Sequence, residues 1–117
     1  MAAKQKESSL FLRGNLVALR AVEESDMPAI ARWLNDPAVT YYLFYGQLPM
    51  GSEAVREMIR AQIASRMNVV FTACDRKTGI PIGLCGLYDI HLTARKAEFR
   101  ILVGERRFWG KGYGTEI

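Results

Sequence analysis

Arg107-Phe-Trp-Gly110-Lys-Gly112-Tyr-Gly114-Thr-Glu116 is the stretch of this 117-residue chain that decides its fold. It places glycines at alternate positions and follows the apolar segment Ala97-Glu-Phe-Arg-Ile-Leu-Val103. Glycines at this density let the backbone turn sharply and let its N–H groups approach a ligand without obstruction by a Cβ atom. N–H groups that converge in front of a helix form a site for phosphate oxygens. The stretch therefore predicts a phosphate-binding loop between a strand and a helix that begins near Thr115 or Glu116.

Two common phosphate loops do not fit this stretch. A P-loop ends in Gly-Lys-Ser or Gly-Lys-Thr, whereas Lys111 is followed by Gly112. A dinucleotide-binding loop has its first glycine directly after the strand, whereas residues 105–109 separate Gly104 from Gly110. The pattern that remains is Arg-x-x-Gly-x-Gly. A tight glycine-rich turn without a ligand is the alternative to a binding loop.

The longer segment from Ala97 to Glu116 resembles the acyl-coenzyme A loop of the GNAT family of N-acetyltransferases, most of all the branch that acetylates ribosomal proteins and spermidine. The resemblance covers residues 12–117, preceded by a polar N-terminal tail over residues 1–11. It implies an α/β fold of GNAT type, with a mixed, mainly antiparallel sheet flanked by helices. It also implies that the chain is the first part of one domain, truncated after the pyrophosphate loop. We therefore expect a fragment that is inactive when expressed alone.

The hydrophobic pattern independently predicts the same order of elements. Ser25 is the expected N-cap of a first helix that ends at Asn35-Asp36-Pro37, and a second helix starts after Ser52. Alternating or continuous apolar runs bounded by turn residues predict the strands. The expected strands span residues 16–20, 69–74, 82–88 and 97–103.

Composition and charge exclude several other classes of protein. The chain contains no apolar run near the roughly 20 residues that span a bilayer, and its polar N-terminus lacks the apolar core of a signal peptide. Cys74 and Cys85 lie in apolar strand candidates without metal-ligand spacing, which favours reduced thiols in a cytoplasmic protein without a metal. The net charge of +4 comes from scattered basic residues, so we expect no nucleic-acid partner. The densest basic cluster, Arg106, Arg107 and Lys111, lies beside the glycine loop and suits an anionic cofactor.

The resemblance implies acetyl-coenzyme A as cosubstrate and assigns the residues that bind it. Loop amides would bind the pyrophosphate, and strand backbone groups would bind the pantetheine arm and polarise the thioester carbonyl. The loop residues are Arg107, Gly110, Lys111, Gly112, Gly114 and Thr115, and the strand residues are Ile101, Leu102 and Val103.

Glu98 matches a strand glutamate that serves some members of the family as general base. A carboxylate near the incoming amine can remove its proton, directly or through water. The alternative is an ion pair with Arg100, two positions along the same strand face. The general acid of the family is a tyrosine beyond the glycine loop, and Tyr113 inside the loop is not assigned that role.

The acceptor is expected to be an amine of a small molecule or a peptide, attacking the thioester directly in a ternary complex. The segment Tyr41-Tyr-Leu-Phe-Tyr45 either contributes to the acceptor wall or caps the core. The alternative function is a non-catalytic module that binds acyl-coenzyme A or a nucleotide. An open edge at the strand 97–103 would invite self-association, so a homodimer also remains open.

Overall fold

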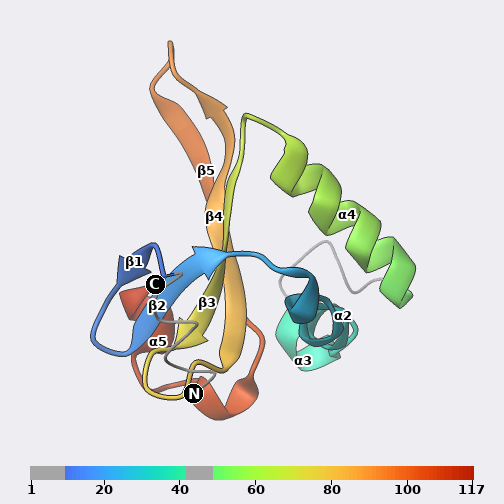
Figure 1. The fold of residues 1–117 in the computed structure, drawn as a ribbon, viewed down its shortest axis with the longest axis vertical. Coiled ribbons are helices and arrows are strands. Elements are labelled where there is room, and N and C mark those ends of the chain that lie inside the picture. The colour runs from blue at the N-terminus through green and yellow to red at the C-terminus, as the bar shows by residue number, and fades with distance from the viewer. Residues whose placement is uncertain (1–9, 42–48) are drawn as a thin grey trace.

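A five-stranded antiparallel sheet forms the centre of the molecule, with the strands in the order β1-β2-β3-β4-β5 (Figure 1). The computed structural model describes residues 10–41 and 49–117, so most of the predicted N-terminal tail and residues 42–45 of the aromatic segment lie outside the described residues. The strands are β1 (Leu12–Arg13), β2 (Val17–Ala21), β3 (Val69–Asp75), β4 (Pro81–His91) and β5 (Lys96–Val103).

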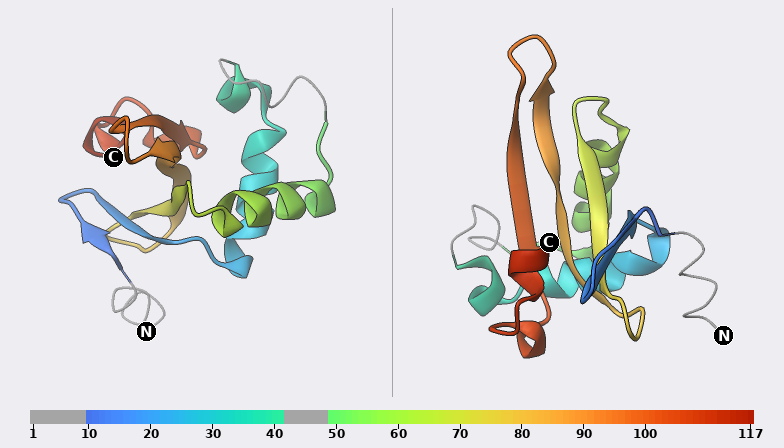
Figure 2. Two further views of the ribbon diagram at one scale, coloured as in Figure 1. Left: turned by 90° about the horizontal axis from the view of Figure 1, so that it is seen from above. Right: turned by 90° about the vertical axis from the view of Figure 1, so that its left-hand side faces the viewer.

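Helices cover the two faces of this sheet unequally. The three N-terminal α-helices lie on one face and α5 lies on the other (Figure 2). The helices are α2 (Met27–Leu34), α3 (Pro37–Thr40), α4 (Ser52–Ala64) and α5 (Tyr113–Glu116), with 3-10 turns η1 (Glu24–Asp26) and η2 (Arg106–Phe108). The predicted α/β architecture with a mainly antiparallel sheet flanked by helices is confirmed.

The main core lies between the sheet and the helices α2 and α4. Their buried side chains recur every three or four residues, as expected of helices with one apolar face. They pack against Leu84 of β4 and the partly buried Leu102 of β5. The buried helical residues are Met27, Ile30, Trp33, Leu34, Val55 and Ile59.

A smaller core lies on the opposite face, under the C-terminal segment. Val17, Ala73 and Ile82 are buried there and are covered by side chains that include Phe108 and Tyr113. An irregularity in the β3–β4 register, between Ala73 and Cys74, allows Ile82 to serve this face while Leu84 serves the helix-covered face.

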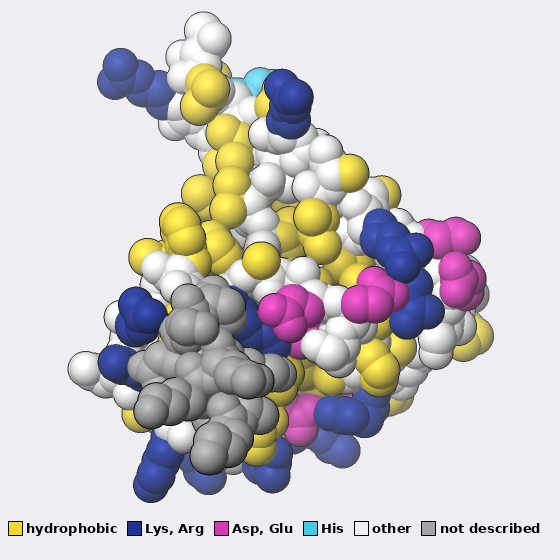
Figure 3. Space-filling view, viewed as in Figure 1, with side chains coloured by type: hydrophobic (Ala, Val, Ile, Leu, Met, Phe, Trp, Pro, Cys, Tyr) yellow, Lys and Arg dark blue, Asp and Glu magenta, His cyan; other side chains and the backbone are white. Residues whose placement is uncertain are grey.

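The same face stays apolar beyond the reach of α5. Val69, Leu87 and Phe99 are direct neighbours across β3, β4 and β5, and their exposed fractions are 41%, 44% and 56%. Figure 3 shows hydrophobic side chains along the β4–β5 hairpin in the upper part of the view.

A buried ion pair sets the start of α2, and it corrects the prediction that Ser25 is the N-cap. Both oxygens of Asp26 accept hydrogen bonds of 2.8 Å from Arg20 of β2, and Oδ2 also accepts from the Thr72 hydroxyl and the Glu23 amide. Burial opposes ionisation of Asp26, but these hydrogen bonds outweigh it and keep the pKa of the carboxyl below its usual value. Ser25 therefore lies inside η1, which Glu23 caps.

Gly104, directly after β5, allows the close approach of the buried Trp33 ring. A Cβ atom at Gly104 would lie 2.1 Å from Trp33 Cγ. We expect Gly104→Ala to lower the free energy of unfolding by about 1–3 kcal/mol, because a rigid indole cannot yield that space without repacking. Chemical denaturation measures this change. The control is Gly114→Ala, whose Cβ would meet its nearest neighbour, Val103 Cγ2, at 3.7 Å. Equal stability of the two variants would contradict the described contact.

Candidate functional site

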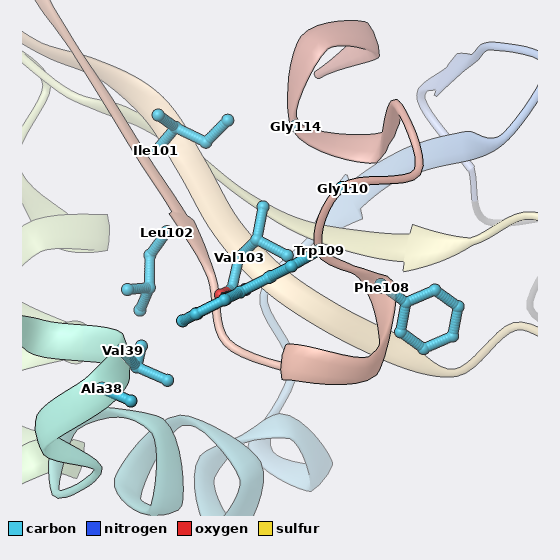
Figure 4. A pocket seen from close by; sticks show the side chains of 9 residues that line it. All are labelled: Ala38, Val39, Ile101, Leu102, Val103, Phe108, Trp109, Gly110 and Gly114. Carbon is cyan, nitrogen blue, oxygen red and sulfur yellow. Dashed lines mark hydrogen bonds between the residues drawn. The ribbon is translucent and has the colours of Figure 1, made fainter.

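A cleft of about 400 Å³ opens beside the end of β5, between α3 and the glycine loop (Figure 4). One wall comes from α3, one from the last residues of β5, and one from the segment that connects β5 to α5. The lining residues are Ala38, Val39, Ile101, Leu102, Val103, Phe108, Trp109, Gly110 and Gly114. The structure therefore brings the predicted strand residues together with two of the predicted loop residues.

The backbone of β5 forms one edge of the sheet in the part of the chain that the structure describes. In an antiparallel ladder, residues that exchange hydrogen bonds with the neighbouring strand alternate with residues that do not. Gly104 N donates to Ile82 O at 2.7 Å, which continues the β4–β5 register. The alternation then turns the backbone groups of Ile101 and Val103 toward the open edge, whereas those of Leu102 turn toward β4. Leu102 contributes its side chain to the cleft wall.

Trp109 makes use of one of these outward-facing groups. Its indole Nε1 donates a hydrogen bond of 2.8 Å to the carbonyl oxygen of Val103. Trp109 is not a core residue, since 43% of it is exposed, and its ring forms part of the cleft wall. Figure 4 shows the ring reaching from the loop past Val103 toward α3.

The glycine loop has the left-handed conformation that its sequence requires. Gly110 and Gly112 have φ values of 70° and 88°, a region that side chains with a Cβ atom rarely adopt. Within residues 10–41 and 49–117, no backbone carbonyl accepts a hydrogen bond from the amides of Gly110, Lys111, Gly112, Gly114 or Thr115. These amides remain available to a ligand.

Three basic side chains lie in or next to the loop. Arg107 opens the loop with its guanidinium 5.2 Å from the Phe108 ring centre, and Lys111 is exposed between the two left-handed glycines. Arg106 points back to α3, where its Nε lies 3.4 Å from Asp36 Oδ2. The positive charges of Arg107 and Lys111 can therefore serve an anion at the loop.

Glu98 lies farther along β5 and takes part in the ion pair that the sequence offered as an alternative. Arg100 donates from Nε to Glu98 Oε1 at 2.9 Å and from Nη2 to Oε2 at 3.2 Å, and its guanidinium lies 4.3 Å from the Tyr88 ring centre. The hydrogen bonds from Arg100 lower the pKa of the Glu98 carboxyl. Four residues of strand separate Glu98 from Leu102, roughly 13 Å. Its role as a general base remains a prediction.

Glu105 is a polar residue of this region that sequence reasoning missed. Its Oε2 accepts a hydrogen bond of 2.6 Å from Trp33 Nε1, and it also pairs with Arg32, so α2 is tied to the junction of β5 and η2. Burial opposes its ionisation, but the hydrogen bonds from Trp33 and Arg32 outweigh burial and lower the pKa. An acidic residue two positions after the predicted strand 97–103 was the signal that the sequence offered.

None of the helices formed by the described residues combines the length and the apolar character that crossing a bilayer requires. A comparison of the sequence with curated proteins gives no match. A family model described as an acetyltransferase (GNAT) domain matches residues 17–117.

Several solved structures are similar to this chain. A spermidine N-acetyltransferase from Vibrio cholerae, in complex with CoA and spermine, is 27% identical with a TM-score of 0.73. The match covers 86% of this chain and 57% of that one. A GNAT-family acetyltransferase from Bacillus anthracis is 18% identical with a TM-score of 0.72, covering 92% of this chain and 60% of that one.

A third similar structure is RimL, a ribosomal L7/L12 alpha-N-protein acetyltransferase in complex with CoA, 17% identical with a TM-score of 0.72. That match covers 88% of this chain and 59% of RimL. At identities of 17% and 18%, RimL and the Bacillus anthracis protein support the fold alone. In each of the three comparisons this chain spans less than two thirds of the length of the other chain.

Proposed function

The chain belongs to the GNAT acetyltransferase family, and from this membership we propose that the protein transfers an acetyl group from acetyl-coenzyme A to a primary amine. The observation that carries the proposal is a single cleft bordered by both the outward-facing backbone of β5 and the glycine loop with its available amides. Extended backbone suits the amide groups of a pantetheine arm, and converging N–H groups suit a pyrophosphate.

The bound cofactor would extend from the glycine loop to the open edge of β5. The pyrophosphate would accept hydrogen bonds from the amides of residues 110–115, with Arg107 and Lys111 supplying positive charge. The pantetheine arm would then follow the open edge of β5 at Ile101 and Val103. The indole of Trp109 donates a hydrogen bond to the Val103 carbonyl, which the arm would also approach. The indole would therefore either keep this hydrogen bond and lie beside the arm, or break it and leave the carbonyl to the arm.

The reaction would be direct attack by the amine on the thioester carbonyl. A C–N bond would form and the C–S bond would break, so that coenzyme A leaves as a thiolate that takes a proton from water. A backbone N–H at the edge of β5 would polarise that carbonyl and stabilise the negative charge on its oxygen in the transition state. Glu98, farther along the strand, would accept the proton from the amine, directly or through water. The carboxylate is ionised at neutral pH, and its pairing with Arg100 lowers its pKa and therefore weakens it as a base until the amine displaces that contact.

We propose a small primary amine as the acceptor, because the spermidine N-acetyltransferase of similar fold contains spermine in its structure. A peptide amine is the second acceptor class, which the sequence resemblance to ribosomal-protein acetyltransferases supports. Glu98 lies far enough along β5 to meet an amine that approaches from the side of the β4–β5 hairpin.

The second candidate function is a module that binds acyl-coenzyme A without turnover. The observation that favours it is the two-bond pairing of Glu98 with Arg100, which occupies both carboxylate oxygens of the candidate base. An amine would have to displace Arg100 or use the remaining lone pairs of the carboxylate.

One experiment separates the two functions. The whole protein is incubated with acetyl-coenzyme A and a panel of amines, comprising polyamines, amino acids and peptides with free N-termini, while a thiol reagent detects the coenzyme A released. Calorimetry with coenzyme A is run in parallel. Amine-dependent thiol release supports acetyl transfer, and binding without release supports the non-catalytic module. Absence of binding contradicts both functions.

A further inference from the structure

The first turn of α5 is tied to the β3–β4 hairpin by a carboxylate that neither the sequence patterns nor the proposed reaction use. Asp75, at the end of β3, is 5% exposed. Its Oδ1 accepts a hydrogen bond of 3.0 Å from the Tyr113 hydroxyl, and its Oδ2 accepts one of 2.6 Å from the Thr78 hydroxyl. Burial and the neighbouring Asp75 carboxylate raise the pKa of Tyr113, so its hydroxyl keeps the proton that it donates.

A second carboxylate fixes the other end of the same short helix. Glu116 accepts hydrogen bonds from the amide of Leu16 at 2.9 and 3.1 Å and from the amide of Val17 at 3.1 Å, so the end of α5 is attached to the start of β2. Tyr113 in addition packs edge-on against Phe108, with 4.9 Å between the ring centres. These contacts place α5 on the small core formed by Val17, Ala73 and Ile82.

The backbone of the glycine loop does not by itself hold the loop in one conformation. Glycine loses more backbone freedom on folding than other residues, and the amides of Gly110, Lys111 and Gly112 donate no backbone hydrogen bond within the described residues. A binding site on such a turn gains affinity when contacts outside it fix its geometry before the ligand arrives. Tyr113 directly follows Gly112 in the chain. The hydrogen bond from its hydroxyl to Asp75 therefore also restricts the adjoining backbone of the loop and the orientation of its amides.

We infer that Asp75 and the Tyr113 hydroxyl position the glycine loop for the pyrophosphate of coenzyme A, without touching the ligand themselves. This inference rests on the proposed function of the loop. The sign of the charge makes it testable. A carboxylate near an anion site weakens anion binding by Coulomb repulsion alone, so a variant without the charge would bind coenzyme A more tightly if Asp75 acted only through its field. A positioning role requires instead that losing the hydrogen bond weakens binding.

Tyr113→Phe tests the hydrogen bond, because phenylalanine keeps the ring packed against Phe108. We expect the Kd for coenzyme A and the KM for acetyl-coenzyme A to rise about tenfold, as for the loss of one hydrogen bond to a charged group. The kcat at saturating acetyl-coenzyme A is expected to stay within about twofold, because the ligand orders the loop once it is bound. Asp75→Asn retains an oxygen that accepts from Tyr113 and removes the charge, so it should bind coenzyme A at least as tightly as the parent protein.

The double variant and a matched control complete the experiment. Tyr113→Phe combined with Asp75→Ala should bind coenzyme A no more weakly than Tyr113→Phe alone, since both changes break the same hydrogen bond. Tyr88→Phe removes a tyrosine hydroxyl of β4 that contacts Gln62 at 3.5 Å, and it should bind coenzyme A like the parent. Three results would each overturn the inference. Tyr113→Phe could bind coenzyme A as tightly as the parent, Asp75→Asn could lose as much affinity as Tyr113→Phe, or the losses in the double variant could multiply. If the parent protein does not bind coenzyme A, the proposed function fails instead.

Discussion

Gly112→Val is expected to abolish coenzyme A binding while the protein stays folded. Gly112 has a φ of 88°, and a β-branched side chain is a strong outlier in that region. Space is not the limiting factor, because the nearest atom to a Cβ at this position is Leu16 Cδ1 at 3.6 Å. The loop with valine would therefore adopt another backbone conformation, in which the amides of residues 110–115 no longer converge on one anion.

Calorimetric titration with coenzyme A measures this loss, and circular dichroism checks that the helices remain. Gly112→Asn is the matched control, because asparagine tolerates the left-handed region better than other residues with a Cβ atom. It should keep measurable binding while the valine variant shows none. Unchanged affinity of Gly112→Val would rule out the assignment of this loop as the pyrophosphate site.

In the whole protein, Glu98→Gln is expected to lower turnover about 100-fold or more at neutral pH, which is a usual contribution of a general base. Glutamine preserves the shape of the side chain and one oxygen for Arg100, but it cannot accept the proton of the amine. The affinity for coenzyme A should hardly change, since Glu98 lies roughly 13 Å along β5 from Leu102. Steady-state kinetics with the best amine of the panel gives both quantities. Turnover within a factor of two of the parent protein would leave Glu98 only its ion pair with Arg100.

The pH profile gives a separate test of the same residue. Arg100 lowers the pKa of Glu98, so the carboxylate stays ionised, and the base competent, down to a lower pH than an unpaired glutamate would allow. In Arg100→Met the pKa of Glu98 should return toward its usual value, which moves the acidic limb of the kcat/KM profile to higher pH. An acidic limb that is the same in both proteins would show that Glu98 is not the group that titrates.

The predicted helices and strands depended on local patterns, and the differences arose where a distant contact overrides the pattern. α2 and α4 follow from apolar residues on one helical face, and the buried residues of both helices lie on that face, although Ile63 near the end of α4 is exposed. Ser25 was wrongly assigned as N-cap because Asp26 is committed to Arg20 and Thr72, which belong to strands. The sequence also did not predict the shift in β3–β4 register at Ala73, which places the Ile82 side chain in the smaller core under α5.

α3 was missed although the sequence carried its signal. Asp36-Pro37 was interpreted only as the end of the first helix, yet Asp36 accepts a hydrogen bond from Ala38 N at 3.0 Å and Pro37 occupies the first turn of a new helix. An aspartate followed by proline is a favourable N-cap and first helical residue. This short helix matters because Ala38 and Val39 form one wall of the cleft.

The site could be predicted as far as its residues are adjacent in sequence. The glycines and the strand before them predict a ligand-binding loop, because the spacing of the glycines and their conformational freedom are local properties of the sequence. The residues that fix the loop could not be found in this way. Tyr113 is 38 positions from Asp75, and Trp33 is 72 positions from Glu105, so these hydrogen bonds exist only through the fold.

A titration of ¹⁵N-labelled protein with coenzyme A, followed by amide NMR spectra, tests whether the glycine loop and the open edge of β5 together bind the cofactor. We expect saturable shifts that are largest for the amides of Gly110, Gly112, Gly114 and Thr115, with a second group at Ile101 and Val103. Dephospho-coenzyme A, which keeps the pyrophosphate, should shift the same loop amides, and free pantetheine should shift only the strand. Saturable shifts centred away from both segments, or no shifts at millimolar coenzyme A, would contradict binding at these two segments.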